Sequence, residues 1–343
     1  MLANSEALGM MGGADDPDFA GDGSIAALDF SDLYLEPDGR AWFKTYANDP
    51  VRHEVDGAAR KAIGTLVSHL AERVAKRDFR LRYDGLSMRG ARFETAMGGS
   101  LYVLRRHTPR ALDFTTLGYG SRIERALLSR EKRDGLYLFT GGTSSGKTVG
   151  ATSLTVELMR RYGGAGYTIE NPIEVEIEGI YSSGEATGTL YQKEIDDDSE
   201  FGPEIRRRMR GSPNLIMIGE LRNADAVLQA LLAATASATV IATYHAADQL
   251  TGLQRLASMV RDAGGDSGLF AHGLAAVIHQ ELLLTDRSGE LQRQLRVTPL
   301  IVAGSRNEAG MRSQLHGTDF RQLSSDIDRQ KRVMTSSSPD VGF

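Results

Sequence analysis

The chain has 343 residues, of which 41% are hydrophobic and 25% charged, a composition typical of a soluble globular protein of about two domains. Its formal net charge of −5 argues against a protein whose whole surface binds nucleic acid, although it allows a local basic groove. The chain has no cysteine, which excludes disulfides, thiol catalysis and thiolate zinc sites and fits a reducing compartment.

The chain begins with a Gly- and Asp-rich stretch, residues 1–24, that we expect to be a disordered tail. This stretch contains no basic residue and no sustained apolar segment, so we do not expect it to be a secretory signal. The first folded segment is expected to start near Ile25.

The next segment predicts a small α+β domain. Residues 33–43 predict two strands joined by a Pro-Asp-Gly turn, and the helical spacing of apolar residues predicts an amphipathic helix over 56–77. Short strand-like pieces separated by glycines follow over 79–106, and they are rich in arginine. We therefore predict an N-terminal α+β domain over residues 25–108 and a linker over 109–117.

Beyond residue 117, strands and helices alternate, which is typical of a parallel sheet with crossover helices. We predict this second domain over 118–330 and a flexible Ser-rich tail over 331–343. The predicted strands are 136–140, 167–170, 215–218 and 239–243. An uncharged stretch, 226–244, is long enough to suggest a membrane span, but its period changes midway. A buried helix to about Ala236 followed by a buried strand explains it better.

Residues 141–148 fit the motif G-x-x-x-x-G-K-S/T, and they lie between a short apolar strand and a predicted helix. Glycines at such a turn let backbone N–H groups point inward, and the helix dipole adds positive potential. Lys147 is expected to reach the β- and γ-phosphates, and Thr148 to hold Mg²⁺ through its hydroxyl. The sequence therefore predicts a nucleoside triphosphate site. The residues expected to bind the nucleotide are Gly142, Thr143, Ser144, Ser145, Gly146, Lys147, Thr148 and Val149.

Candidate catalytic side chains follow the predicted strands, where α/β sheets place their ligand sites. Glu220 could orient or deprotonate an attacking water or bind Mg²⁺ through water, or it could be a solvated Glu at a strand end. Glu170 and Glu174 could assist the metal or solvate a turn. His245 could sense the γ-phosphate as a neutral imidazole. The other six histidines, His279 among them, receive a structural interpretation.

Four segments in order resemble the motifs of the secretion ATPase superfamily, in its PilT-like branch of pilus retraction motors and Dot/Icm and conjugative-transfer ATPases. The first is the phosphate loop, 141–148. Residues 168–174 resemble the acidic box, 212–223 the atypical Walker B segment that ends in Gly-Glu, and 243–245 the histidine box. The resemblance covers residues 33–280.

Two residues depart from the family pattern, since Asn171 and Asn223 stand where Asp is usual. Each removes a charge near the expected metal site, which leaves the carboxylate roles open. The absence of cysteine argues against the pilus-assembly and type II secretion relatives, which usually carry a four-cysteine zinc loop. Little resembles the retraction motors after Gln280. These features favour the DotB-like and conjugative-transfer members.

The resemblance implies an α/β protein with an N-terminal PAS-like α+β domain and a C-terminal RecA-like P-loop ATPase domain, assembled as a homohexamer. It implies ATP and Mg²⁺ as cofactors, with Arg105 or Arg106 contacting the nucleotide of a neighbouring subunit. Hydrolysis would rock the domains about the linker and drive substrate transfer or pilus dynamics. It also implies a cytoplasmic protein at the inner membrane, with membrane-embedded secretion or pilus platform proteins and a transferred protein or nucleoprotein substrate as partners.

Two other functions fit parts of the sequence. A RecA-like ATP-dependent nucleic-acid translocase is supported by Arg206 and Arg210, which lie one helical turn apart in a basic segment. A regulatory module that binds ATP without cycling is supported by Asn171 and Asn223. Salt-dependent DNA binding would favour the first, and an absence of phosphate release the second.

Overall fold

The computed structural model describes residues 18–46, 49–96, 98–106, 111–129, 134–287, 290–317, 319–335 and 343. The chain divides into two compact units, Met1–Pro109 and Arg110–Phe343, which are described one at a time below.

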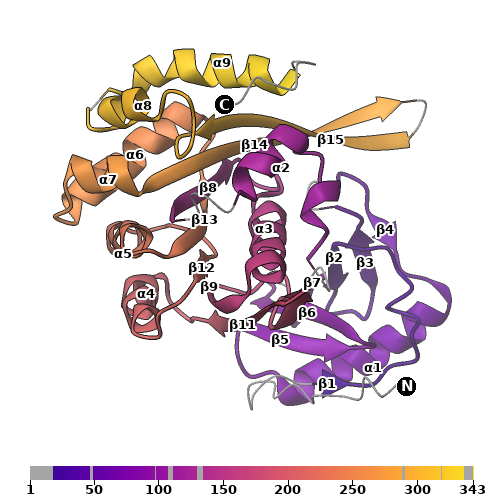
Figure 1. The fold of residues 1–343 in the computed structure, drawn as a ribbon. Helices are drawn as coiled ribbons and strands as arrows, with labels where there is room; N and C mark the ends of the chain where they lie inside the picture. The colour runs from indigo at the N-terminus through magenta and orange to yellow at the C-terminus, as the bar shows by residue number, and fades with distance from the viewer. Residues whose placement is uncertain are drawn as a thin grey trace. The chain divides into compact units, whose positions relative to one another are not determined.

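The first unit is a seven-stranded sheet with helix α1 (Gly57–Arg73) packed on it (Figure 1). Its strand order is β1-β5-β6-β7-β2-β3-β4, and only β1 and β5 run parallel to each other. The strands are β1 (Asp18–Phe19), β2 (Asp32–Leu35), β3 (Ala41–Lys44), β4 (His53–Glu54), β5 (Asp78–Tyr83), β6 (Leu86–Glu94) and β7 (Ser100–Arg106). The amphipathic helix buries Ile63, Leu66 and Leu70 in one core with Leu33 and Leu104 of the sheet. The structure thus contains the predicted hairpin, β2–β3, and the predicted helix.

The expected N-terminal tail is partly ordered. Residues 1–17 lie outside the described residues, but β1 pairs with β5 from Asp18 onward, and Phe19 is buried and stacks on the ring of His69 at 4.6 Å. Ile25, inside the same core, is fully buried. The composition of the stretch suggested disorder, but one aromatic side chain is enough to fix this segment to the sheet.

The second unit is built on an eight-stranded sheet of order β10-β11-β9-β12-β13-β8-β14-β15. The strands from β11 to β14 in this order are parallel, and β10 and β15 pair antiparallel at the two edges. The strands are β8 (Gly135–Gly141), β9 (Gly164–Glu170), β10 (Gly179–Ser183), β11 (Ala186–Glu194), β12 (Leu215–Ile218), β13 (Thr239–His245), β14 (Leu274–Arg287) and β15 (Glu290–Ile301). The four predicted strands correspond to β8, β9, β12 and β13.

Helices cover both faces of this sheet (Figure 1). They are α2 (Ser121–Leu127), α3 (Lys147–Tyr162), α4 (Phe201–Met209), α5 (Ala224–Thr235), α6 (Gln249–Asp262), α7 (Ser267–Gly273), α8 (Glu308–Leu315) and α9 (Leu323–Thr335), with short 3₁₀ turns η1 (Phe114–Thr116), η2 (Asp198–Glu200) and η3 (Phe320–Gln322). Strand β8 separates two cores, because its alternate side chains point to opposite faces. Leu136 and Leu138 lie in a core with α4 to α8, whereas Tyr137 and Phe139 lie in a core with α2 and α3.

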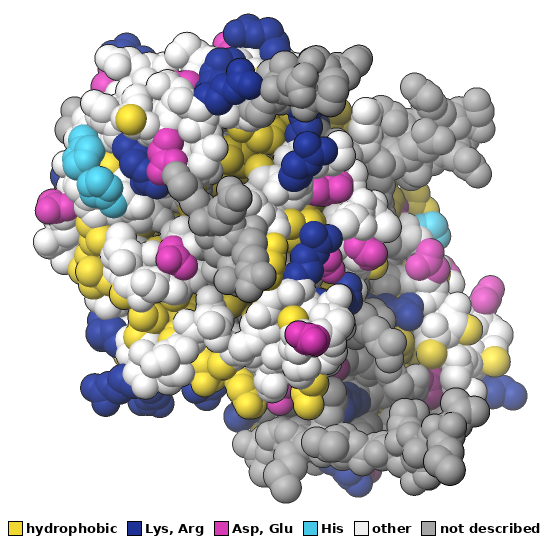
Figure 2. Space-filling view, viewed as in Figure 1, with side chains coloured by type: hydrophobic (Ala, Val, Ile, Leu, Met, Phe, Trp, Pro, Cys, Tyr) yellow, Lys and Arg dark blue, Asp and Glu magenta, His cyan; other side chains and the backbone are white. Residues whose placement is uncertain are grey.

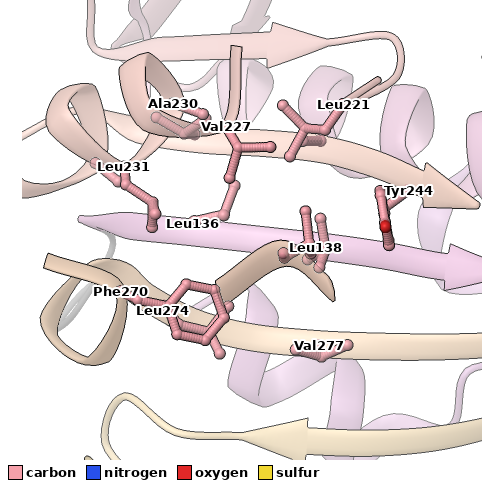
Figure 3. Close-up of a cluster of buried hydrophobic side chains, with 14 of the residues drawn as sticks. Leu136, Leu138, Leu221, Val227, Ala230, Leu231, Tyr244, Phe270, Leu274 and Val277 are labelled. Atoms are coloured by element: carbon pink, nitrogen blue, oxygen red, sulfur yellow. The ribbon is translucent and has the colours of Figure 1, made fainter. Parts of the chain in front are cut away.

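Figure 3 shows part of the first of these cores, with Leu136 and Leu138 of β8 facing Val227 and Leu231 of α5. The uncharged stretch around α5 and β13 is thus a buried helix followed by a buried strand, as predicted. Dense apolar packing behind β8 holds its carboxyl end rigidly in place, and the phosphate loop begins there.

The predicted linker and C-terminal tail are more ordered than expected. Phe114, inside the expected linker, is fully buried and stacks on Tyr119 at 4.9 Å. Helix α9 continues to Thr335, with Val333 buried against the α3 face of the sheet. Residues 336–342 lie outside the described residues, but the side chain of Phe343 is buried and its carbonyl accepts from the Arg306 N–H at 2.8 Å. Both segments are held by apolar side chains packed in the α3-side core, which composition alone does not reveal.

Candidate nucleotide-binding site

The phosphate loop connects β8 to α3 at the carboxyl end of the parallel strands. Gly146 has a φ of 87°, in the left-handed region, and it immediately precedes the first residue of α3. Gly141 has a φ of 151°, and a Cβ atom there would lie 2.3 Å from the carbonyl oxygen of Gln280 on β14. The two glycines therefore shape the turn as the motif predicts.

The loop fits a phosphate group. A Cβ atom on Gly142 would meet nothing within 4 Å, so the backbone is open on that side. The side chain of Ser145 is buried, and its hydroxyl has no hydrogen-bond partner among the described residues. Lys147 donates from Nζ to the carbonyl of Gly142 at 2.6 Å, so its ammonium already lies over the loop. An open cradle with a buried unpaired hydroxyl and an ammonium matches the chemistry of phosphate oxygens.

Carboxylates influence Lys147 from neighbouring strands. Partial burial lowers the pKa of Lys147 below its ordinary value, while the charges of Glu220 and Glu174 act in the opposite direction. An electrostatic effect of this kind requires proximity. The parallel pairing of β9, β12, β13 and β8 places the segments that follow these strands, with Glu174, Glu220 and Lys147, on the same side of the sheet.

His245 is aligned with the phosphate loop by strand pairing. In the register of β13 and β8, His245 is the partner of Gly141, and the N–H of Ala246 donates to the Gly141 carbonyl at 3.3 Å. The His245 side chain is exposed. Strand pairing thus places His245 beside the first glycine of the loop, and its contact with phosphate stays a prediction.

Glu220 is not a simply solvated strand-end carboxylate. Its side chain is 28% exposed, and its Oε2 accepts from Arg222 Nε at 2.7 Å. Glycine at position 219 lets the chain pass close to β9, since a Cβ there would lie 3.2 Å from the Cα of Glu170. Glu220 therefore follows the buried strand β12 directly, and its carboxylate forms an ion pair with Arg222.

The two carboxylates of the predicted acidic box have different environments. Glu170 is 1% exposed, and its Oε1 accepts from Thr168 at 2.6 Å and from Gln192 at 2.9 Å. Glu174 is exposed on the loop after β9. The contacts of Glu170 favour an internal structural part for this side chain, because one of its oxygens is already committed to β9 and β11.

Both asparagines that depart from the family pattern contact Asp198 in η2. The Asn171 amide donates to the Asp198 carboxylate at 3.0 Å, and the Asn223 amide donates to the Asp198 carbonyl at 2.6 Å. Asn223 is also the N-cap of α5, because its Oδ1 accepts from the N–H of Ala226 at 2.8 Å. Asn caps helices about as well as Asp, so the departure at position 223 keeps the cap without a second charge.

Strand β14 supplies contacts to the loop that sequence reasoning missed. Gln280 is 1% exposed and its amide lies 3.5 Å from the carbonyl of Ser145, while His279 Nδ1 lies 2.9 Å from the hydroxyl of Thr140. Burial lowers the pKa of His279, so the ring is neutral near pH 7. The available signal was a pair of polar residues inside the apolar run 274–284, which points to a buried strand with a polar neighbour.

The remaining predicted residues have clear locations. Thr148 and Val149 lie in the first turn of α3, and Thr143 and Ser144 are exposed in the loop. Arg105 and Arg106 belong to β7 of the first unit, where Arg105 Nε pairs with Asp32 at 2.7 Å and Arg106 donates to the Leu28 carbonyl at 3.1 Å. Among the described residues there is no cluster of His, Asp and Glu able to hold a metal ion alone. A metal bound at Thr148 would therefore share its coordination with phosphate oxygens.

The basic segment of α4 is largely neutralised within the second unit. Arg206 pairs with Asp225 at 2.9 Å, and Arg207 and Arg208 pair with Glu204 at 2.9 and 3.2 Å. On the face seen in Figure 2, Lys and Arg side chains are scattered and interspersed with Asp and Glu. Neither feature resembles the continuous basic surface that nucleic-acid binding requires. In the described residues, no helix is long and apolar enough to span a membrane.

Comparison with known sequences identifies one family. A family model described as "Type II/IV secretion system protein" matches residues 24–303. The type II secretion system protein HxcR of Pseudomonas aeruginosa is 30% identical over 278 residues, covering 74% of this chain and 54% of HxcR. The type IV pilus assembly ATPase TfpB of Acinetobacter baylyi is 28% identical over 270 residues, covering 74% and 44%. The chain thus spans about half the length of the curated relatives it matches.

Solved structures show the same fold. The pilus retraction motor PilT with bound ADP superposes with a TM-score of 0.65 at 21% identity, over 91% of this chain and 87% of PilT. The ATPase DotB of Legionella pneumophila superposes with a TM-score of 0.64 at 20% identity, over 91% of this chain and 85% of DotB. The predicted fold class, a PAS-like α+β domain followed by a RecA-like α/β domain, is confirmed. The likeness extends past Gln280, where the sequence alone suggested little, because the family match continues through β14 and β15.

Proposed function

Because the chain belongs to the type II/IV secretion system protein family, we propose that it is an ATPase that couples ATP hydrolysis to substrate transfer or pilus dynamics. One arrangement carries the proposal. The phosphate loop has open space at Gly142 and the ammonium of Lys147 over it, and the parallel strands β12 and β13 lead to Glu220 and His245 on the side of the sheet where this loop begins. A phosphate site with a strand-end carboxylate beside it is equipped for hydrolysis as well as for binding.

The site residues divide into binding and catalytic groups. Lys147 and the N–H groups at the start of α3 bind the phosphates, and Thr148 holds Mg²⁺, which supplies charge neutralisation when bound. Glu220 orients and activates the attacking water, and His245 contacts the γ-phosphate from beside Gly141. Glu174 contributes negative charge near the metal, whereas Glu170 positions the strand ends from within the sheet.

The assembly proposal follows from the family. The subunit forms a homohexamer in which residues 25–108 of one subunit close over the nucleotide of the next, with Arg105 or Arg106 compensating phosphate charge. The hinge lies in the predicted linker 109–117, before Phe114, which is buried in the second unit. The ring works at the cytoplasmic face of the inner membrane with the platform proteins of a type IV secretion, conjugation or pilus system. The exposed guanidinium of Arg105, 64% accessible although paired with Asp32, supports a contact of this kind.

The structure offers little support for the alternative of a nucleic-acid translocase. Of the two arginines that suggested it, Arg206 pairs with Asp225 of the same unit, and the neighbouring Arg207 and Arg208 pair with Glu204. A module that binds ATP without cycling would be suggested by missing charge at positions 171 and 223, but the carboxylate of Asp198 lies against the Asn171 amide, and its backbone carbonyl accepts from the Asn223 amide.

Replacement of Lys147 tests the proposed site. The Lys147→Ala variant should lose both nucleotide binding and steady-state phosphate release, because it removes the only ammonium that the described loop directs at the phosphates. Arg161→Gln is a matched control, since it removes an exposed cation from the far end of the same helix. Phosphate release at the unmodified rate in Lys147→Ala would contradict the proposal.

A further inference from the structure

The carboxylate of Asp198 is the centre of a polar cluster beside the proposed catalytic residue. Its Oδ2 accepts from Arg222 NH1 at 3.1 Å, and its Oδ1 accepts from the Asn171 amide at 3.0 Å. Its backbone carbonyl accepts from the Asn223 amide. Through these contacts, the 3₁₀ turn η2 bridges the segments that follow β9 and β12, two strands that are adjacent in the sheet.

Arg222 bridges two carboxylates. Its Nε and NH2 lie 2.7 Å from Oε2 of Glu220, and its NH1 contacts Asp198. Burial acts to lower the pKa of Arg222, but the hydrogen bonds to Glu220 and Asp198 outweigh it and raise that pKa. The guanidinium therefore remains charged, and its planar fork fixes the direction of each partner.

We propose that Asp198 is a positioning residue for Glu220 and acts through Arg222. This inference rests on the proposed ATPase function. The Arg222 side chain is 46% exposed, and a single ion pair at such a site contributes only about 0–1 kcal/mol. One pair with Glu220 therefore does not hold the guanidinium in a single orientation. The second pair, with Asp198, fixes its plane and so fixes the direction of the Glu220 carboxylate.

Asp198 also limits how strongly Arg222 neutralises Glu220. A guanidinium that lies between two carboxylates divides its hydrogen bonds between them, so each carboxylate receives fewer than it would from a guanidinium paired with it alone. Without Asp198, Arg222 would pair with Glu220 alone, and the guanidinium could turn about that single contact. The side chains at 171 and 223 that contact Asp198 are uncharged amides, so Asp198 supplies the second carboxylate of the Arg222 bridge.

The test is a set of charge-neutral and charge-exchanged variants in the full chain, measured for phosphate release and for binding of a fluorescent ATP analogue. Asp198→Asn should lower kcat about tenfold with little change in the affinity for the analogue, since misdirection of a catalytic base affects the chemical step. The double variant Asn171→Asp/Asp198→Asn returns a carboxylate to the cluster across a 3.0 Å contact and should recover part of the lost kcat. Recovery by exchange separates positioning from a loss of folding.

Arg222→Lys alters the side chain that joins Asp198 to Glu220. It keeps the positive charge but loses the fork, so kcat should fall as in Asp198→Asn. Asp225→Asn is the matched control, because it removes a similarly exposed carboxylate that pairs with Arg206 at 2.9 Å, away from Glu220. This control should keep the kcat of the unmodified chain.

Three results would overturn the inference: an Asp198→Asn variant with kcat within twofold of the unmodified chain, an equal loss of kcat and nucleotide affinity, or a double variant no faster than the single one. Failure of the proposed function would look different. In that case the unmodified chain would release no phosphate, or Lys147→Ala would release it normally.

Discussion

The phosphate loop could be predicted residue by residue because its motif consists of consecutive residues. The glycines, Lys147 and Thr148 have their roles within eight consecutive residues, and strand and helix signals on both sides confirm the context. The contacts of Glu170 could not be predicted in this way, because its partner Gln192 is 22 residues further along the chain. The same limitation applies to Asp198, which contacts Asn171 and Arg222 only through the folded sheet.

His279 should make the stability of the second unit depend on pH. Burial lowers its pKa, so below about pH 6.5 the unfolded chain takes up a proton that the folded chain resists. The free energy of unfolding should therefore fall as the pH decreases from about 6.5, with a slope of at most about 1.4 kcal/mol per pH unit from this group.

The variant His279→Asn isolates this contribution. Asparagine can keep a hydrogen bond to Thr140, which His279 contacts at 2.9 Å, but it does not titrate. Urea unfolding followed by circular dichroism should show a flatter pH dependence for the variant between pH 5 and 6.5, and a constant difference from the unmodified chain at about pH 8. Identical slopes for the two chains would show that His279 does not resist protonation.

At the scale of elements, prediction worked where the hydrophobic pattern was strong. The strands β8, β12 and β13 are buried almost throughout and are rich in apolar residues, whereas β9 is buried mainly toward its carboxyl end. The hairpin of β10 and β11 was missed because Gly, Ser and Thr interrupt its apolar residues and only Gly188 and Leu190 of the two strands are buried. Strands β14 and β15 were missed because their pairing with β8 and with each other is a tertiary property, and His279 and Gln280 interrupt the apolar pattern.

The termini show the same dependence on tertiary packing. β1, η1 and α9 each extend order into a segment that composition predicts to be a tail or a linker. In each case buried side chains, Phe19, Phe114 and Val333 among them, pack the segment on a core. Burying one such side chain contributes about 1.5–3 kcal/mol, which offsets the backbone entropy of ordering about one or two residues.

At the scale of the whole molecule, the family assignment rests on four motifs that β8, β9, β12 and β13 bring to one edge of a sheet. The proposed homohexamer predicts a measurable change of mass. In light scattering, addition of Mg²⁺ and a non-hydrolysable ATP analogue should shift the chain toward a particle of six subunits, since nucleotide bound between subunits favours the assembled state. A monomer under all nucleotide conditions would contradict the ring.

The central claim is that this site hydrolyses ATP with Glu220 as the residue that activates water. The most direct measurement compares the unmodified chain with Glu220→Gln in two assays, binding of a fluorescent ATP analogue and steady-state release of phosphate. The amide keeps the size of the side chain but is not a base, so binding should be retained while phosphate release falls by about 10²-fold or more. Near-normal phosphate release by Glu220→Gln would contradict the claim.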